Sequence, residues 1–355
     1  MQLKYPHSTE TMTAKYAKDQ PAGFINRIER VAIVGATGKV GSYMTKELLS
    51  TGKHVVTAIT RKGGGSSMPK GVKVAEVDYD REETLVEALR GQQFLVVSLS
   101  VQAPAETQDK LARAAAKAGV SWMMPNCYGT DVRNDALEKE NLSGPPILAG
   151  IAAAEKAGVS WVTMCCSFWY DYSLAMGPGW FGFDFDKKEV TMIDDGKTRI
   201  NVSTWDLCGR AIKALLSLKE LPDDEADKSV TLSRWRDQPL YISSFLISQR
   251  DMLDSIHRVQ GTTDADWRIE HEESSARYKR GMALLQKGNF VGFGMCLYTR
   301  TFYPNGDGNF GAKYGLANEA LGLPEEDLDE ATKRTLASLD EFRRNPVYVK
   351  AYGQS

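Results

Sequence analysis

The sequence lacks the features that mark several classes of protein. Its five cysteines are odd in number and form no Cys-x-x-Cys pair, and there are only four histidines, so we expect no metal site and no disulfide framework. Lysine and arginine (44) do not outnumber aspartate and glutamate (46), which disfavours nucleic acid as a partner. No apolar run has the length of a signal peptide or of a membrane span, about 18 residues. We therefore expect a cytoplasmic protein with no membrane partner; its oligomeric state stays unknown.

The chain does contain enough apolar residues for a large core. Of its 355 residues, 42% are hydrophobic and 25% are charged. Short apolar runs alternate with amphipathic stretches, a pattern that predicts parallel strands joined by crossover helices. The predicted strands are 31–34, 55–59, 72–75, 94–97, 122–124 and 161–164, and the predicted helices between them include 43–49, 83–89 and 107–118. The predicted fold class is α/β, with a doubly wound parallel sheet.

A glycine-rich turn lies between the first predicted strand and the first predicted helix. Gly35 permits a tight turn, Gly38 lets the backbone approach a pyrophosphate, and Gly41 lets the helix lie close to the sheet. Free amides at the start of a helix attract an anion. The pattern predicts a Rossmann-like dinucleotide site, although a merely tight turn is the alternative. The candidate binding residues in this turn are Gly35, Thr37, Gly38, Lys39, Val40 and Gly41.

Two basic residues follow the second predicted strand, where an NAD-selective protein normally has an acidic one. Arg61 can bind a 2′-phosphate with its forked guanidinium and stack on adenine, and Lys62 can add charge. These residues favour NADP(H) over NAD(H). The alternative is that they are a solvated pair opening the loop at 63–65.

Further candidate cofactor contacts follow the third to sixth predicted strands. Ligands of open parallel sheets collect at the carboxyl ends of the strands. For the residues after the third and fourth strands, ordinary loop chemistry is an equal alternative. The candidates are Asp78, Tyr79, Ser98, Leu99, Ser100, Gln102, Asn126, Cys127, Ser167 and Phe168.

The alternation of strands and helices changes after about residue 165. Aromatic and glycine-rich loops occupy 168–185, a strand is predicted near 199–202, and helices are predicted at 205–218, 243–259, 272–288 and 329–344. We expect three parts, the last of them a smaller, interleaved C-terminal substrate domain. They are an N-terminal extension at 1–28, an NADP-binding domain at 29–166 with a return near 189–218, and a substrate domain at 167–188 and 219–355.

Several segments together resemble the NmrA-like and isoflavone-reductase-like family of atypical short-chain dehydrogenases. The resemblance is carried by Gly35–Gly41, Arg61, Met124–Asp131, Ala157–Thr163, Asp195–Lys197 and Asn201–Asp206. It implies a Rossmann-like NADP domain followed by a smaller substrate domain. Family members include reductases of specialised metabolism and regulators that bind the dinucleotide without turning it over.

The chain departs from the reductase branch of this family at two places. It reads Pro125-Asn-Cys-Tyr-Gly129 where that branch usually has Pro-Ser-Glu-Phe-Gly. The branch's catalytic lysine matches a position near Ile147 or Ala149, and neither side chain can transfer a proton. The Tyr-x-x-x-Lys pair of ordinary short-chain dehydrogenases is also missing.

Tyr128 is the candidate catalytic residue, because a reduced substrate needs a proton or a hydrogen bond where charge develops. An aromatic wall is the alternative role for its ring. The aromatic residues of 168–185 suggest either a pocket for a planar substrate or a core between lobes. We therefore predict an NADPH-dependent reductase of a medium-sized aromatic or polyketide-like metabolite, acting on C=O, C=N or C=C. A non-catalytic NADP(H)-sensing regulator and a redox-neutral isomerase or cyclase are the alternatives.

Overall fold

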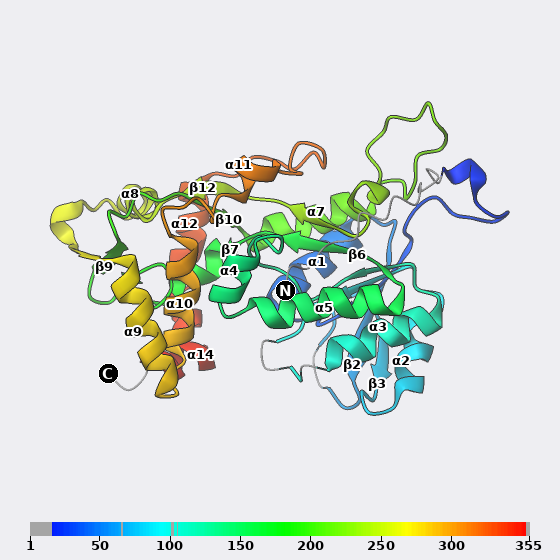
Figure 1. Cartoon of the computed structure of the whole chain (residues 1–355), viewed down its shortest axis with the longest axis horizontal. Helices are drawn as coiled ribbons and strands as arrows, with labels where there is room; N and C mark the ends of the chain where they lie inside the picture. Colours follow the sequence, from blue (N-terminus) through cyan, green and yellow to red (C-terminus); the bar gives the residue numbers. More distant parts are fainter. Residues whose placement is uncertain (1–15, 65–66, 101–102, 105, 353–355) are drawn as a thin grey trace.

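A seven-stranded, wholly parallel sheet forms the centre of the computed structural model (Figure 1), which describes residues 16–64, 67–100, 103–104 and 106–352. The strand order is β11-β6-β5-β4-β1-β2-β3. The strands are β1 (Arg30–Val34), β2 (Val55–Arg61), β3 (Lys73–Val77), β4 (Phe94–Val97), β5 (Trp122–Met124), β6 (Ser160–Cys165) and β11 (Gln238–Tyr241). The predicted doubly wound α/β fold is confirmed.

Helices cover both faces of this sheet. One face carries α1 (Lys39–Ser50) and α7 (Trp205–Leu216), which pack against each other, and the other carries α2 (Glu82–Leu89), α3 (Thr107–Ala118) and α5 (Gly144–Ala157). Successive residues of a strand point to opposite faces, so Val31 and Ile33 of β1 join one core while Ala32 and Val34 join the other. Burial on both faces explains why these strands read as continuous apolar runs.

The seventh strand, β11, lies far along the chain from the other six. It pairs with β6 at the edge of the sheet, and Asp237 starts it by accepting a hydrogen bond from the Trp161 amide at 2.9 Å. Pro239 lacks an amide hydrogen, which an edge strand tolerates. The sequence analysis missed this strand because a four-residue segment containing proline gives no strand pattern.

The division into domains stays a prediction.

The remaining elements gather beside the sheet, on the left of Figure 1. Two small sheets have the orders β12-β10-β7 and β13-β9-β8. Their strands are β7 (Phe168–Trp169), β8 (Phe183–Asp184), β9 (Glu189–Ile193), β10 (Ile200–Ser203), β12 (Phe245–Ile247) and β13 (Arg268–Glu272). The helices are α4 (Asp135–Glu140), α6 (Tyr170–Ala175), α8 (Gln249–Gln260), α9 (Ser274–Gln286), α10 (Val291–Thr301), α11 (Phe310–Tyr314), α12 (Leu328–Ala337), α13 (Leu339–Arg343) and α14 (Pro346–Tyr352).

The described part of the N-terminal extension packs on the loop that follows α7. The Ala17 amide donates to the Pro222 carbonyl at 2.8 Å, and the Asn26 side chain exchanges two hydrogen bonds with the backbone of Leu221. Among all the helices that the structure describes, none is long and apolar enough to cross a membrane.

Candidate functional site

The glycine turn between β1 and α1 has a geometry that only glycine permits. Gly35 has φ of +78°, and a Cβ atom there would lie 1.9 Å from the Ser98 carbonyl oxygen at the end of β4. A Cβ on Gly41 would lie 2.1 Å from the Gly35 carbonyl oxygen. The turn is therefore pressed against both the neighbouring strand end and its own helix, as a dinucleotide turn requires.

The start of α1 offers hydrogen-bond donors to an anion. Gly38 donates its amide to the Gly35 carbonyl at 2.9 Å, but the amides of Lys39 and Val40 donate to no acceptor within the described residues. Thr37 is exposed beside them, and the Val40 side chain is buried in the core. Unpaired amides at a helix N-terminus form a site for a phosphate. The Lys39 ammonium lies 2.7 Å from the Glu341 carboxylate of α13.

The basic residues at the end of β2 are free to bind a ligand. Arg61 is exposed, and no carboxylate of the described chain pairs with it or with Lys62. Burial raises the pKa of Tyr79, and the nearby Arg61 charge opposes that rise, so the two side chains are neighbours. Asp78 instead serves the turn into α2, because its carboxylate accepts the Asp80 amide at 3.0 Å.

The ends of β4 and β5 are joined through one side chain. The side-chain amide of Asn126 accepts a hydrogen bond from the backbone amide of Leu99 at 3.0 Å and donates one to the Leu99 carbonyl at 3.2 Å. This pair of bonds fixes the segment 98–100, in which Ser98 is half-buried and Ser100 is exposed. Gln102 lies outside the described residues.

The hydroxyl group of Tyr128, the predicted proton donor, is hydrogen-bonded to the backbone. The Tyr128 hydroxyl donates to the Val97 carbonyl at 2.9 Å, and burial holds the pKa of Tyr128 well above its usual range. Cys127 beside it is fully buried, and the neighbouring Cys165 thiol, together with burial, raises the pKa of Cys127 well above the ordinary value. Neither group is an activated acid or nucleophile in this geometry.

Apolar and strained residues complete this end of the sheet. The Ile147 side chain lies against Gly129, since a Cβ on Gly129 would be 3.7 Å from Ile147 Cδ1. Ser167 has φ of +55°, and its amide donates to the Gly129 carbonyl at 2.8 Å. The buried Ser167 hydroxyl has no hydrogen-bond partner within the described residues. Ile147, one of the two residues near which the family resemblance placed a lysine, thus lies against Gly129.

The aromatic residues that follow β6 pack as a core. Phe168 is buried and stacks on Tyr298 with a ring separation of 3.8 Å. Phe181 meets both rings edge to face. Phe183 packs against Trp267. The rings therefore fill the interior between elements, which was one of the two alternatives for this segment.

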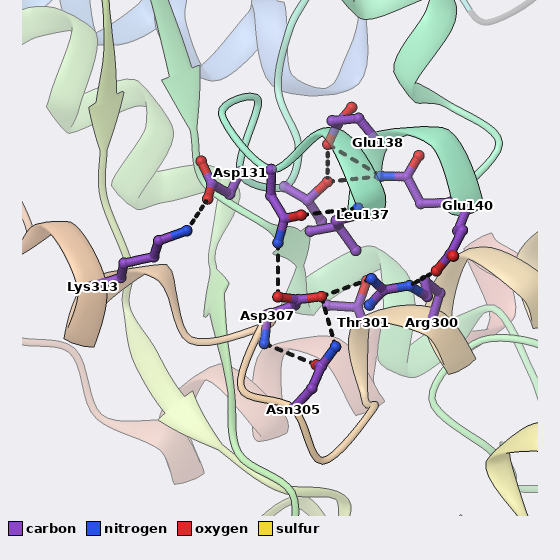
Figure 2. Close-up of polar contacts among 12 residues, drawn as sticks. Asp131, Leu137, Glu138, Glu140, Arg300, Thr301, Asn305, Asp307 and Lys313 are labelled. Atoms are coloured by element: carbon purple, nitrogen blue, oxygen red, sulfur yellow. Dashed lines mark hydrogen bonds and ion pairs between the residues drawn. The ribbon is translucent and has the colours of Figure 1, made fainter. Parts of the chain in front are cut away.

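Sequence reasoning missed a polar network around α4 (Figure 2). The buried Arg300 of α10 bridges Glu140 of α4 and Asp307. Glu138 is also buried; its carboxylate accepts a hydrogen bond from Thr130 at 2.7 Å, and burial raises its pKa to about 7. No sequence pattern indicates these contacts, because Arg300 and Glu140 lie 160 residues apart. Nowhere in the described chain do three or more His, Cys, Asp or Glu side chains form a group that could hold a metal ion.

Comparison with known proteins agrees with the fold. Residues 28–143 match the model of the NmrA-like family. Over these residues the chain is similar to NmrA-like proteins. The chain is 26% identical over 306 residues to the oxidoreductase aprR of Aspergillus flavus, a match that covers 85% of this chain and 96% of the relative.

Solved structures share the fold of this protein at low sequence identity. An isoflavone reductase is 19% identical with a TM-score of 0.67, covering 86% of this chain and 99% of that one. The triphenylmethane reductase of a Citrobacter species, complexed with NADP(H), is 14% identical with a TM-score of 0.62 and the same coverage. At these identities the likeness shows the common fold.

Proposed function

We propose that this protein is an NADP(H)-dependent oxidoreductase of the NmrA-like family. The observation that carries the proposal is the combination of unpaired amides at Lys39 and Val40 with the exposed, unpaired Arg61 at the end of β2. The first can hold a pyrophosphate and the second a 2′-phosphate. The oxidoreductase relative from Aspergillus flavus and the NADP(H) complex of the Citrobacter reductase support this assignment.

Each remaining candidate residue has a place in the proposed site. Lys62 would add charge beside the 2′-phosphate, and Asp78 and Tyr79 would border the adenine. Ser98, Leu99 and Ser100, which come after β4, would border the cofactor, with Asn126 and the backbone of Cys127 across from them. Gln102 stays a predicted contact. Ser167 and Phe168 would lie nearest the nicotinamide. The bound cofactor would supply the hydride, and these residues would orient it.

The proposed substrate is a medium-sized aromatic or polyketide-like metabolite with a C=O, C=N or C=C bond to reduce. Relatives with this fold are described as isoflavone, triphenylmethane and quinone reductases, which supports an aromatic substrate. Tyr128 would contribute a hydrogen bond at the reacting atom only if its hydroxyl left the Val97 carbonyl. We also propose a cytoplasmic location, which five free cysteines favour.

A second candidate is an NADP(H)-binding regulator without turnover. It is favoured by the Tyr128 hydrogen bond to Val97 and by Ile147 of α5, which lies against Gly129, because neither residue can deliver a proton there in this geometry.

One experiment separates the two candidates. The purified protein is titrated calorimetrically with NADPH, NADP⁺ and NADH, and NADPH absorbance is then followed with a panel of quinones, aromatic ketones and enones. NADPH binding with oxidation by a panel member supports the reductase. Binding without turnover across the panel supports the regulator, and failure to bind any dinucleotide contradicts both.

A further inference from the structure

Helix α13, the second-last helix of the described chain, reaches back to the start of α1. Glu341 of α13 lies 2.7 Å from the ammonium of Lys39, the first residue of α1. The same ammonium is 5.7 Å from the ring of Trp205 and 5.6 Å from the ring of Phe342. A cation over two aromatic faces with a carboxylate beside it is held from three sides. Lys39 is thereby drawn toward α13.

Buried contacts fix α13 in this place. Phe342 is only 3% exposed and stacks on Trp205 with a ring separation of 6.2 Å and an interplanar angle of 14°. It also meets Tyr172 edge to face at 6.0 Å. The Trp205 amide in turn donates to Asp171 at 2.9 Å. The fold therefore positions α13 so that the Glu341 carboxylate reaches the ammonium of the first residue of α1.

The charges at this corner conflict with a bound pyrophosphate. The hydrogen bond and charge of Lys39 hold the pKa of Glu341 below its ordinary value, so this carboxylate is ionised at neutral pH. A pyrophosphate on the Lys39 and Val40 amides would attract the Lys39 ammonium and repel the Glu341 carboxylate. The pyrophosphate and the Glu341 carboxylate would then compete for the Lys39 ammonium.

We propose that α13 forms one wall of the dinucleotide site and that Glu341 competes with the cofactor pyrophosphate for Lys39. Glu341 then lowers the affinity for NADP(H) and Lys39 raises it, so the last helices of the chain set the strength of cofactor binding. This inference rests on the proposed function.

Substitutions at the pair test the inference through binding alone. Side chains are half exposed at Lys39 and 70% exposed at Glu341, so replacing either leaves the core intact. We expect Glu341→Gln to tighten NADP⁺ binding about two- to fivefold, a size typical of exposed ion pairs. Lys39→Met should weaken binding by about three- to tenfold. In the Lys39→Met protein, Glu341→Gln should change the affinity less than about twofold.

Glu330→Gln is the matched control, because Glu330 belongs to an equally exposed pair with Lys333 on α12. It removes the same charge without touching Lys39. All variants are titrated calorimetrically with NADP⁺ at low ionic strength, with thermal unfolding as a check of folding. The proposed competition is contradicted if the Glu341→Gln protein binds NADP⁺ no more tightly than the Glu330→Gln protein. It is also contradicted if Glu341→Gln has the same effect in the Lys39→Met protein. Neither result would contradict the proposed cofactor. If the unaltered protein binds no NADP⁺, the proposed function fails first, and the competition fails with it.

Discussion

The two ends of the candidate site are built in different ways. At the phosphate end, Gly35 and Gly41 shape the turn, and the Lys39 and Val40 amides have no partner within the described residues. Arg61 has no carboxylate partner there either. At the opposite end, the Tyr128 hydroxyl is bonded to the backbone and Ile147 covers Gly129. The chain thus keeps the features that hold a dinucleotide, while the groups beside the expected nicotinamide position are already occupied. Binding and chemistry must be tested separately.

The largest effect is expected from Gly35→Ala at the phosphate end. The added Cβ would meet the Ser98 carbonyl oxygen at 1.9 Å on a backbone with φ of +78°. We expect a loss of about 2–4 kcal/mol in the free energy of unfolding, together with loss of NADPH binding. Gly52→Ala is the control, because Gly52 also has a positive φ but nothing lies within 4 Å of its Cβ position. Equal destabilisation of both variants in urea unfolding would contradict the close contact.

Glu138→Gln tests the segment after β5 through pH. Burial raises the pKa of Glu138 from 4.5 to about 7, so the folded protein holds this proton more tightly than the unfolded chain does. The protonated carboxyl therefore stabilises the fold below pH 4.5, and that contribution is lost as the pH rises to about 7. The total is of order 2–3 kcal/mol.

Urea unfolding between pH 4.5 and 8 measures this loss. The unaltered protein should lose stability with rising pH relative to Glu138→Gln, whose amide does not titrate. Parallel curves for the two proteins would mean that Glu138 ionises normally.

Arg61→Ala tests the phosphate end by its different effects on NADPH and NADH binding. Removing a forked charge-assisted contact to the 2′-phosphate should weaken NADPH binding by about 10- to 100-fold. NADH binding should stay within about twofold, because NADH lacks that phosphate. Lys62→Ala is the companion variant, with a smaller loss expected. Equal losses for NADPH and NADH in the titration would place Arg61 elsewhere than at the 2′-phosphate.

Tyr128→Phe gives the smallest expected change in stability and decides the role of the opposite end. Loss of the bond to the Val97 carbonyl should lower the free energy of unfolding by about 1–2 kcal/mol. If Tyr128 is an aromatic wall, kcat with a working substrate stays within about threefold. A fall in kcat of tenfold or more at unchanged NADPH affinity would instead identify Tyr128 as a donor.

The phosphate end was predictable because its signals are local. The glycine spacing, the strand before it and the helix after it all lie within residues 30–50, and Arg61 ends the next strand. The short continuous apolar runs likewise located six of the seven strands of the central sheet. The opposite end was not predictable to the same degree. The hydrogen bond from Tyr128 to Val97 and the packing of Ile147 on Gly129 depend on how distant segments meet. The same holds at the phosphate end for the ion pair of Lys39 with Glu341.

The late position of β11 has a consequence for how this protein is made. Residues 238–241 are synthesised well after β6, the strand with which they pair, so β6 has an unpaired edge during synthesis. An unpaired edge strand is a template for wrong pairing and aggregation. A fragment that stops near residue 166 would keep that edge open permanently. Expression of the dinucleotide-binding half alone should therefore yield aggregates, and a usable fragment has to extend past Tyr241.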